Sequence, residues 1–293
     1  MEVNDLLQSA GVVPEQTAVV LNKTTQQPLR DLFPALVFER PDLFDAYQSV
    51  HSRQASATLK KRRFLASFIP LGHFGMLFAG IYEIVSVAEK PTAEIYADPR
   101  FNALATEYGA VDTAPEKNMR RFESQLFFTT RLTDHLVQLR GRLQIALPPG
   151  RTYARLAENL TAPIVAISAD PIMAPPPPPW DCFIVDAPTI TSLPRSWRDQ
   201  LRQWRGVYLI VDQKDGARYV GSAYGQENLL GRWRDHIAGD TGLTKALKSR
   251  QPENSRFSIL QLLAPTAPVE EVVAIENTWK ERLHTRAFGL NEN

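Results

Sequence analysis

The sequence predicts an α+β protein with two domains, and three observations lead to that prediction. A chain of 293 residues is long enough for two domains that each bury a core. Several strand-like runs, rich in aromatic and β-branched residues, follow a helical start. Five consecutive prolines, 175–179, form a semi-rigid spacer. We therefore expect an N-terminal domain at residues 1–173, a linker at 174–180 and a C-terminal domain at 181–293.

Composition narrows the class of protein. The net charge of +1 is low for a protein that binds nucleic acid through a basic excess. A single cysteine, Cys182, excludes an internal disulfide framework and favours a reducing compartment. We find no apolar run of membrane-spanning length and no hydrophobic leader. These features predict a cytoplasmic protein that does not contact a membrane.

The N-terminal domain is expected to begin with helices and continue as strands. A short helix is expected at residues 4–10 and a strand at 17–21. The helical pattern of residues 28–54 is expected to break at Pro34 and at Pro41. Further strands are predicted at 64–69, 76–88, 125–131, 142–146 and 163–167. This order indicates a mixed domain of helices and strands, barrel-like in one interpretation. The phrase LFAGIYEIVSVAE resembles the pseudouridine-synthase-and-archaeosine-type barrels that read modified bases; the alternative is a generic β domain.

A compact basic run precedes the first long strand of this domain. Lys60, Lys61, Arg62 and Arg63 are consecutive. Such a run is ordinarily a solvated loop or helix end, but it is also able to neutralise phosphates of a nucleic-acid backbone. We retain both interpretations, and the second makes these four residues candidate DNA contacts.

The C-terminal domain is organised around a predicted β-hairpin at residues 206–221. Val207–Val211 is an apolar run, and the following four residues, 213–216, have turn chemistry. If those four form the loop, Asp212 pairs with Ala217 and Tyr208 lies opposite Gly221. Because side chains alternate along a strand, Tyr219 then shares a face with Tyr208. An amphipathic helix at 196–204 precedes the hairpin.

Two helices after the hairpin present charged side chains beside apolar stripes. In the helix expected at 229–238, Arg232 and His236 are four residues apart and share a face. In the helix expected at 268–285, Glu276 falls within the apolar stripe. A carboxylate there is costly unless it is paired or binds a cation. Lys280, one turn further, offers an ordinary helical ion pair, and a divalent metal is the alternative.

Together these residues resemble the GIY-YIG nuclease family. The chain has Gly206-Val207-Tyr208, then ten residues, then Tyr219-Val220-Gly221. The family's arginine, glutamate and asparagine are matched by Arg232, Glu276 and Asn291. The resemblance covers about residues 195–293 and implies a small antiparallel sheet flanked by helices that hydrolyses phosphodiester bonds with a divalent metal. The segment 243–245 departs from the family's Gly-Asn-Lys pattern, which puts substrate contacts there in doubt.

The resemblance also implies a role for each matched residue. Tyr208 would activate or position the attacking water, and Tyr219 would orient water or phosphate. Arg232 would stabilise the charge of the transition state, since a guanidinium donates two parallel hydrogen bonds. His236 would relay a proton or orient a neighbour. Glu276 would hold Mg²⁺ (or Mn²⁺), Asn291 would hydrogen-bond the site, and Lys245 and Lys280 would contact DNA.

The sequence thus predicts a metal-dependent endonuclease acting on double-stranded DNA, of the restriction or defence type. Its N-terminal domain is expected to select the target, and a homodimer would cut both strands. The alternatives are a nucleic-acid-binding regulator that has lost cleavage, and a repair or mobile-element nuclease.

Overall fold

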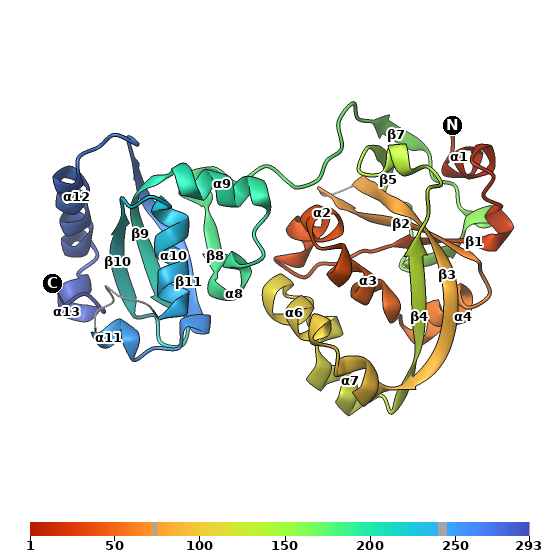
Figure 1. Ribbon diagram of the computed structural model, residues 1–293, viewed down its shortest axis with the longest axis horizontal. Helices are drawn as coiled ribbons and strands as arrows, with labels where there is room; N and C mark the ends of the chain where they lie inside the picture. The colour runs from red at the N-terminus through yellow and green to blue at the C-terminus, as the bar shows by residue number, and fades with distance from the viewer. Residues whose placement is uncertain (73–74, 240–244, 293) are drawn as a thin grey trace. The chain divides into compact units, whose positions relative to one another are not determined.

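The computed structural model describes residues 1–72, 75–239 and 245–292. The chain forms two compact units, Met1–Pro175 and Pro176–Asn293, which meet within the proline run. Each unit has a separate hydrophobic core. Figure 1 shows both units with their elements labelled.

The N-terminal unit is a curled, mixed sheet with helices on it. The sheet order is β6-β1-β2-β3-β5-β7, and β4 pairs with the long strand β3 beyond its contact with β5. Only β1 and β2 run parallel. The strands are β1 (Thr17–Leu21), β2 (Phe64–Leu71), β3 (Gly75–Pro91), β4 (Ser124–Leu132), β5 (Leu143–Ala146), β6 (Ala154–Leu156) and β7 (Ile164–Ile167). The predicted strands are confirmed, while the short β6 and the helices of residues 92–121 were not predicted.

Of the two helix boundaries predicted at prolines in this unit, one is confirmed and one is wrong. The helices are α1 (Val3–Ser9), α2 (Leu29–Glu39), α3 (Pro41–Ser49), α4 (Arg53–Leu59), α5 (Thr92–Tyr96), α6 (Pro99–Tyr108) and α7 (Pro115–Arg121). Pro41 begins α3, as expected. The break expected at Pro34 is wrong, because Pro34 lies inside α2 and is buried. Its ring removes one backbone hydrogen bond near the start of the helix, and the buried apolar residues around it compensate.

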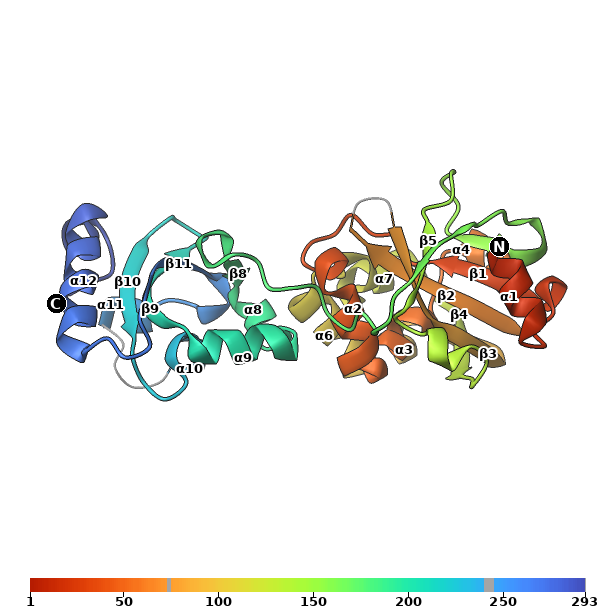
Figure 2. The ribbon, with the colours of Figure 1, turned by 90° about the horizontal axis from the view of Figure 1, so that it is seen from above.

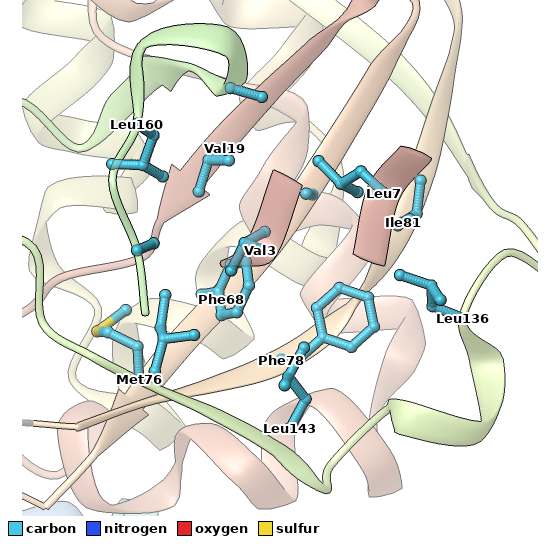
Figure 3. Packing of buried hydrophobic residues seen from close by; sticks show 14 of the residues in the cluster. Val3, Leu7, Val19, Phe68, Met76, Phe78, Ile81, Leu136, Leu143 and Leu160 are labelled. Carbon is cyan, nitrogen blue, oxygen red and sulfur yellow. The ribbon is translucent and has the colours of Figure 1, made fainter. Parts of the chain in front are cut away.

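Alternation along the strands separates two faces of the N-terminal sheet. Val19, Phe68 and Phe78 face a cluster that α1 covers with Val3 and Leu7 (Figure 3). The opposite face receives α3, where Ser67 Oγ donates to Gln48 Oε1 over 2.7 Å. Because successive side chains point to opposite faces, one strand serves both layers.

The C-terminal unit is a four-stranded antiparallel sheet of order β10-β9-β11-β8. Its strands are β8 (Ile184–Asp186), β9 (Arg205–Asp212), β10 (Arg218–Ala223) and β11 (Ser255–Leu263); its helices are α8 (Ala187–Ile190), α9 (Arg195–Gln203), α10 (Asn228–Ala238), α11 (Lys245–Lys248), α12 (Val269–Arg282) and α13 (Thr285–Phe288). The sequence analysis did not predict β11, although it pairs with β9 along its whole length. Figure 2 shows α12 beside the β10 edge, as does Figure 1.

The hairpin register is confirmed. Tyr208 pairs with Gly221, and Asp212 N–H donates to Ala217 O over 2.9 Å. Gly216 in the turn has a φ of 78°. The helix expected to reach Thr285 instead ends at Arg282, because His284 adopts a left-handed backbone with a φ of 53° and begins a separate turn, α13. Among the helices described, none is long and apolar enough to cross a membrane.

Candidate active site of the C-terminal unit

The site begins with the two hairpin tyrosines, which the sheet holds on one face. Tyr208 is fully buried, and Tyr219 is 6% exposed. The Tyr208 ring passes directly over Gly221: a Cβ atom there would lie only 2.6 Å from its Cζ atom. Glycine at position 221 is therefore required for Tyr208 to cross to the next strand.

His236 lies between the two phenols. Its ring centroid is 5.5 Å from that of Tyr208 and 5.4 Å from that of Tyr219. The Tyr208 hydroxyl and His236 Nε2 form a 2.6 Å hydrogen bond. In the described part of the chain the buried Nδ1 atom has no partner. One helical turn earlier on α10, Arg232 keeps 28% of its side chain exposed and pairs with Asp235 over 3.5 Å.

Burial decides the protonation states of this cluster. Desolvation, and then the Arg232 charge, lower the pKa of His236 to about 3. Burial raises the pKa of Tyr208 well above its ordinary value, and it also raises the pKa of Tyr219, where the Glu276 charge adds to the rise. At neutral pH the histidine is therefore neutral and both phenols keep their protons. A neutral imidazole is able to accept a hydrogen bond from an un-ionised phenol, whereas an imidazolium is not.

Glu276 completes the site from α12. Its Oε1 atom pairs with Lys280 Nζ over 2.8 Å, and its Oε2 atom accepts a hydrogen bond from Ser222 Oγ. The glutamate and lysine side chains are only 13% and 3% exposed. The ion pair weighed in the sequence analysis is therefore present, and it occurs inside the site. It offsets much of the cost of burying the carboxylate.

The residues present fit a metal held by few protein ligands. Within the described ranges there is no group of three or more His, Cys, Asp or Glu side chains able to hold a metal. Mg²⁺ requires only one or two carboxylates and keeps several waters. Each Glu276 oxygen has two acceptor positions and uses one of them for Lys280 or Ser222. Glu276 would therefore hold such an ion together with its waters.

Asn291 is brought to the hairpin but acts on its backbone. Its Oδ1 atom accepts from Val220 N–H over 2.9 Å, and its Nδ2 atom donates to Val220 O over 2.8 Å. Leu290 N–H donates to Arg218 O over 2.8 Å. These bonds satisfy the outer edge of β10, which no strand pairs in the described sheet. Asn291 thus holds the strand that carries Tyr219 through its backbone.

The predicted DNA contacts lie in different environments. Lys280 is buried behind Glu276, so it supports the carboxylate and does not present its charge at the surface. Lys245 is exposed on α11. The departure noted at residues 243–245 falls mainly on Leu243 and Thr244, which lie outside the described residues.

The four residues of the basic run in the N-terminal unit, 60–63, also lie in different environments. Lys60 and Lys61 are exposed. Arg62 pairs with Glu158 over 2.8 Å, and Arg63 pairs with Glu83 over 3.3 Å. Two of the four basic side chains therefore form ion pairs within the unit.

Sequence analysis did not identify Ser222 as a site residue. It directly follows Tyr219-Val220-Gly221, and that adjacency was the available signal. Its contact is made with a residue 54 positions later, so no local pattern marked it.

Comparison with known proteins supports this assembly. Residues 205–291 match the family model of the GIY-YIG catalytic domain. A search of the curated proteins found no match. Two solved structures are similar: a point mutant of the catalytic domain of the intron endonuclease I-TevI (22% identity, covering 31% of this chain and 94% of that chain, TM-score 0.26) and the catalytic domain of the homing endonuclease I-TevI (25% identity, 30% and 96%, TM-score 0.25). At these TM-scores the two likenesses carry no argument, and the assignment rests on the family model.

GIY-YIG nucleases generally depend on a divalent metal. The match at residues 205–291 contains Tyr208, Tyr219, Arg232 and Glu276 within one sheet-and-helix assembly. Residues 205–291, within the C-terminal unit, match the GIY-YIG catalytic domain, and this match supports a nuclease activity for that unit.

Proposed function

We propose that the chain is a Mg²⁺-dependent (or Mn²⁺-dependent) endonuclease of the restriction or defence type. Its substrate is double-stranded DNA, and its N-terminal unit selects the target. Two copies act together when both strands are cut, because one such centre hydrolyses one phosphodiester bond at a time.

The observation that best supports this proposal is the hydrogen bond between Tyr208 and His236. A phenol whose pKa is raised by burial is a poor base alone. Tyr208 instead orients the attacking water with its oxygen atom, because its own proton is held in the 2.6 Å hydrogen bond to His236 Nε2. The water oxygen forms a bond to phosphorus as the opposite P–O bond breaks, the water proton passes to solvent, and the leaving oxygen takes one up from solvent. This step needs no free phenolate.

The other side chains stabilise charge. Arg232 is partly exposed, so its guanidinium is able to donate two parallel hydrogen bonds to the phosphate. Glu276 would hold the divalent metal, which supplies Lewis-acid stabilisation when bound. Lys280 orients Glu276 through their ion pair, and Ser222 holds its second oxygen.

The rival function is a DNA-binding regulator that no longer cuts. Every predicted catalytic position is occupied, and five of the six side chains come from the sheet face and helices around Glu276, with Asn291 behind them. We expect purified protein to nick or linearise plasmid with Mg²⁺ or Mn²⁺ and not with chelator. Binding without cleavage at any metal concentration would favour the regulator. Linear product formed without a nicked intermediate would support paired copies.

The proposed division of labour is tested by cutting the chain between Met173 and Trp180. Each unit has its own core, so we expect two stable pieces. The piece from Trp180 onward should cleave weakly and without site preference, and the piece ending at Met173 should bind DNA and cut nothing. If the C-terminal piece alone reproduced the affinity and cleavage pattern of the whole chain, the N-terminal unit would not select the target. A panel of unmodified and base-modified DNA then identifies the target class and separates defence from repair or mobile-element roles.

A further inference from the structure

The N-terminal unit contains a large cavity that the nuclease chemistry does not use. Its volume is about 1540 Å³. Pockets for small ligands commonly measure about 300–1,000 Å³. Segments far apart in sequence line it, among them the chain after β1, the helices α3 and α4, and the start of β4. The space is therefore sufficient for a base together with its sugar and phosphate.

The walls of the cavity are strongly basic. Among the described residues, six basic side chains line it against two carboxylates, Asp112 and Glu89, and Lys117 pairs with Asp112 over 2.5 Å. The whole chain has a net charge of only +1, so this local excess is a feature of the cavity and not of the protein. The six are Lys23, Arg30, Arg53, Lys60, Lys117 and Arg121. Such a concentration of positive charge favours an anionic ligand.

The deeper part of the cavity offers aromatic rings and unsatisfied polar atoms. His51 packs between Phe128 and Tyr153, with ring centroids at 5.4 and 6.1 Å. Burial lowers the pKa of His51 to about 4, so the ring is neutral at physiological pH. The Nε2 atoms of His51 and Gln125 are buried and have no hydrogen-bond partner among the described residues. Both residues line the cavity.

Buried polar atoms without a partner cost free energy, which a ligand that reaches them offsets. An imidazole nitrogen and an amide NH₂ are suited to the hydrogen-bonding edge of a base, and two aromatic residues, Tyr47 and Tyr153, also line the cavity. An anionic group attached to a planar, hydrogen-bonding ring is the chemistry of a nucleotide.

We propose that this cavity binds one nucleotide, with the base against the His51 and Gln125 side and the phosphate at the basic rim. Two sources share that chemistry: a base extruded from duplex DNA, and a free nucleotide acting as an effector. The first source rests on the proposed function, because it makes the cavity the place where the N-terminal unit inspects its target. Extruding a base from the duplex costs the least free energy when that base is mispaired. A duplex with a mispair should therefore bind more tightly than a fully paired duplex.

The test measures binding by the full chain in chelator, so that cleavage plays no part. Duplexes with one mispaired base are compared with fully paired duplexes of the same sequence, and mononucleotides are titrated by calorimetry. We expect a preference of about tenfold or more for the mispaired duplex. Ala57→Trp places a large ring in the cavity from an exposed position on α4, and should abolish the preference. The paired change Arg53→Glu with Lys60→Glu should weaken binding about tenfold or more. Arg120→Glu, an exposed change outside the cavity, is the matched control.

Each outcome decides the proposal. A mispair preference lost in Ala57→Trp supports a base extruded from DNA. Mononucleotide binding that depends on Arg53 and Lys60, without any mispair preference, supports a free nucleotide. Absence of both in the wild-type chain, or equal binding by wild type and both cavity variants, would overturn it. Plasmid cleavage with Mg²⁺ is scored separately, so loss of nucleotide binding alone and loss of nuclease activity alone remain distinguishable.

Discussion

Each unit of the protein contains a tyrosine–histidine pair, which is buried in the C-terminal unit and half-buried in the N-terminal unit. In the C-terminal unit the Tyr208 hydroxyl lies 2.6 Å from His236 Nε2, beside Arg232 and Glu276. In the N-terminal unit the Tyr153 hydroxyl lies 3.4 Å from His51 Nδ1, and the ring borders a wide basic cavity. Both histidines are neutral because burial lowers the pKa of each.

The difference shows that a tyrosine–histidine pair does not determine chemistry by itself. The short bond in the C-terminal unit fixes the orientation of Tyr208, and the adjacent guanidinium and carboxylate supply the charges that hydrolysis needs. The contact in the N-terminal unit is longer, and its histidine borders a cavity lined by basic side chains. One pair is suited to reaction and the other to recognition, and the following predictions test that distinction.

The largest effect is expected for Glu276→Gln. The change removes the carboxylate that would hold the metal, so cleavage should fall roughly a thousandfold or more, measured in single-turnover assays with plasmid. It also removes the buried ion pair between Glu276 and Lys280, which should lower the melting temperature.

Lys280→Met is the matched control for that variant. It breaks the same ion pair from the other side but keeps the carboxylate. We expect a lowered melting temperature with measurable metal-dependent cleavage. If Glu276→Gln cleaved as well as Lys280→Met, the metal role of Glu276 would be wrong.

Arg232→Lys should reduce the rate of the chemical step by about two orders of magnitude. Lysine offers a point charge where two parallel donors are needed. DNA binding in chelator should change little, which separates chemistry from recognition. A decrease of less than about tenfold would make Arg232 a binding residue and weaken the contrast between the two pairs.

The two histidines predict acid sensitivity in both units, and the two units differ in it only below about pH 4. An unfolded histidine has a pKa of about 6.5, whereas His236 has one of about 3 in the folded state. As the pH falls below about 6.5, only the unfolded chain takes up this proton, so the free energy of unfolding decreases by about 1.4 kcal/mol per pH unit. Between pH 6.5 and 5 the C-terminal unit should lose about 2 kcal/mol. For His51 the loss of unfolding free energy with falling pH ends at about pH 4, where the folded N-terminal unit also takes up the proton.

Tryptophan fluorescence isolates this transition in the full chain, because all five tryptophans lie at or after residue 180. The slope should disappear in His236→Gln. An unchanged slope in that variant would show that carboxylates, and not His236, cause the acid sensitivity.

The smallest effect is expected for Asn291→Ala. The change leaves the buried Val220 N–H and C=O groups without partners and should destabilise the C-terminal unit by about 1–3 kcal/mol. The cleavage rate should fall only through misplacement of Tyr219. Asn254→Ala, which loses a single 3.3 Å bond to Gln251, is the control and should stay close to wild type. Equal melting temperatures for the two variants would show that Asn291 does not hold the strand edge.

Local chemistry explains which parts of the site were predictable. The turn at 213–216 fixed the hairpin register, and that register placed Tyr208 opposite Gly221. Helical spacing placed Arg232 and His236 on one face and Glu276 next to Lys280. Pro34 was misjudged because packing of α2 outweighed a local preference.

The sequence by itself predicted a division at the proline run, and it determined the hairpin register that places the two phenols on one face. These depend on turn residues, side-chain periodicity and a proline run, all of which act over a few positions. Only the tertiary structure decided that Ser222 binds Glu276, that Asn291 closes the edge of β10, and that β11 lies beside β9. It also decided that residues from 22 to 153 enclose a basic cavity. Contacts between residues tens of positions apart depend on how elements pack, and packing leaves no local pattern in the chain.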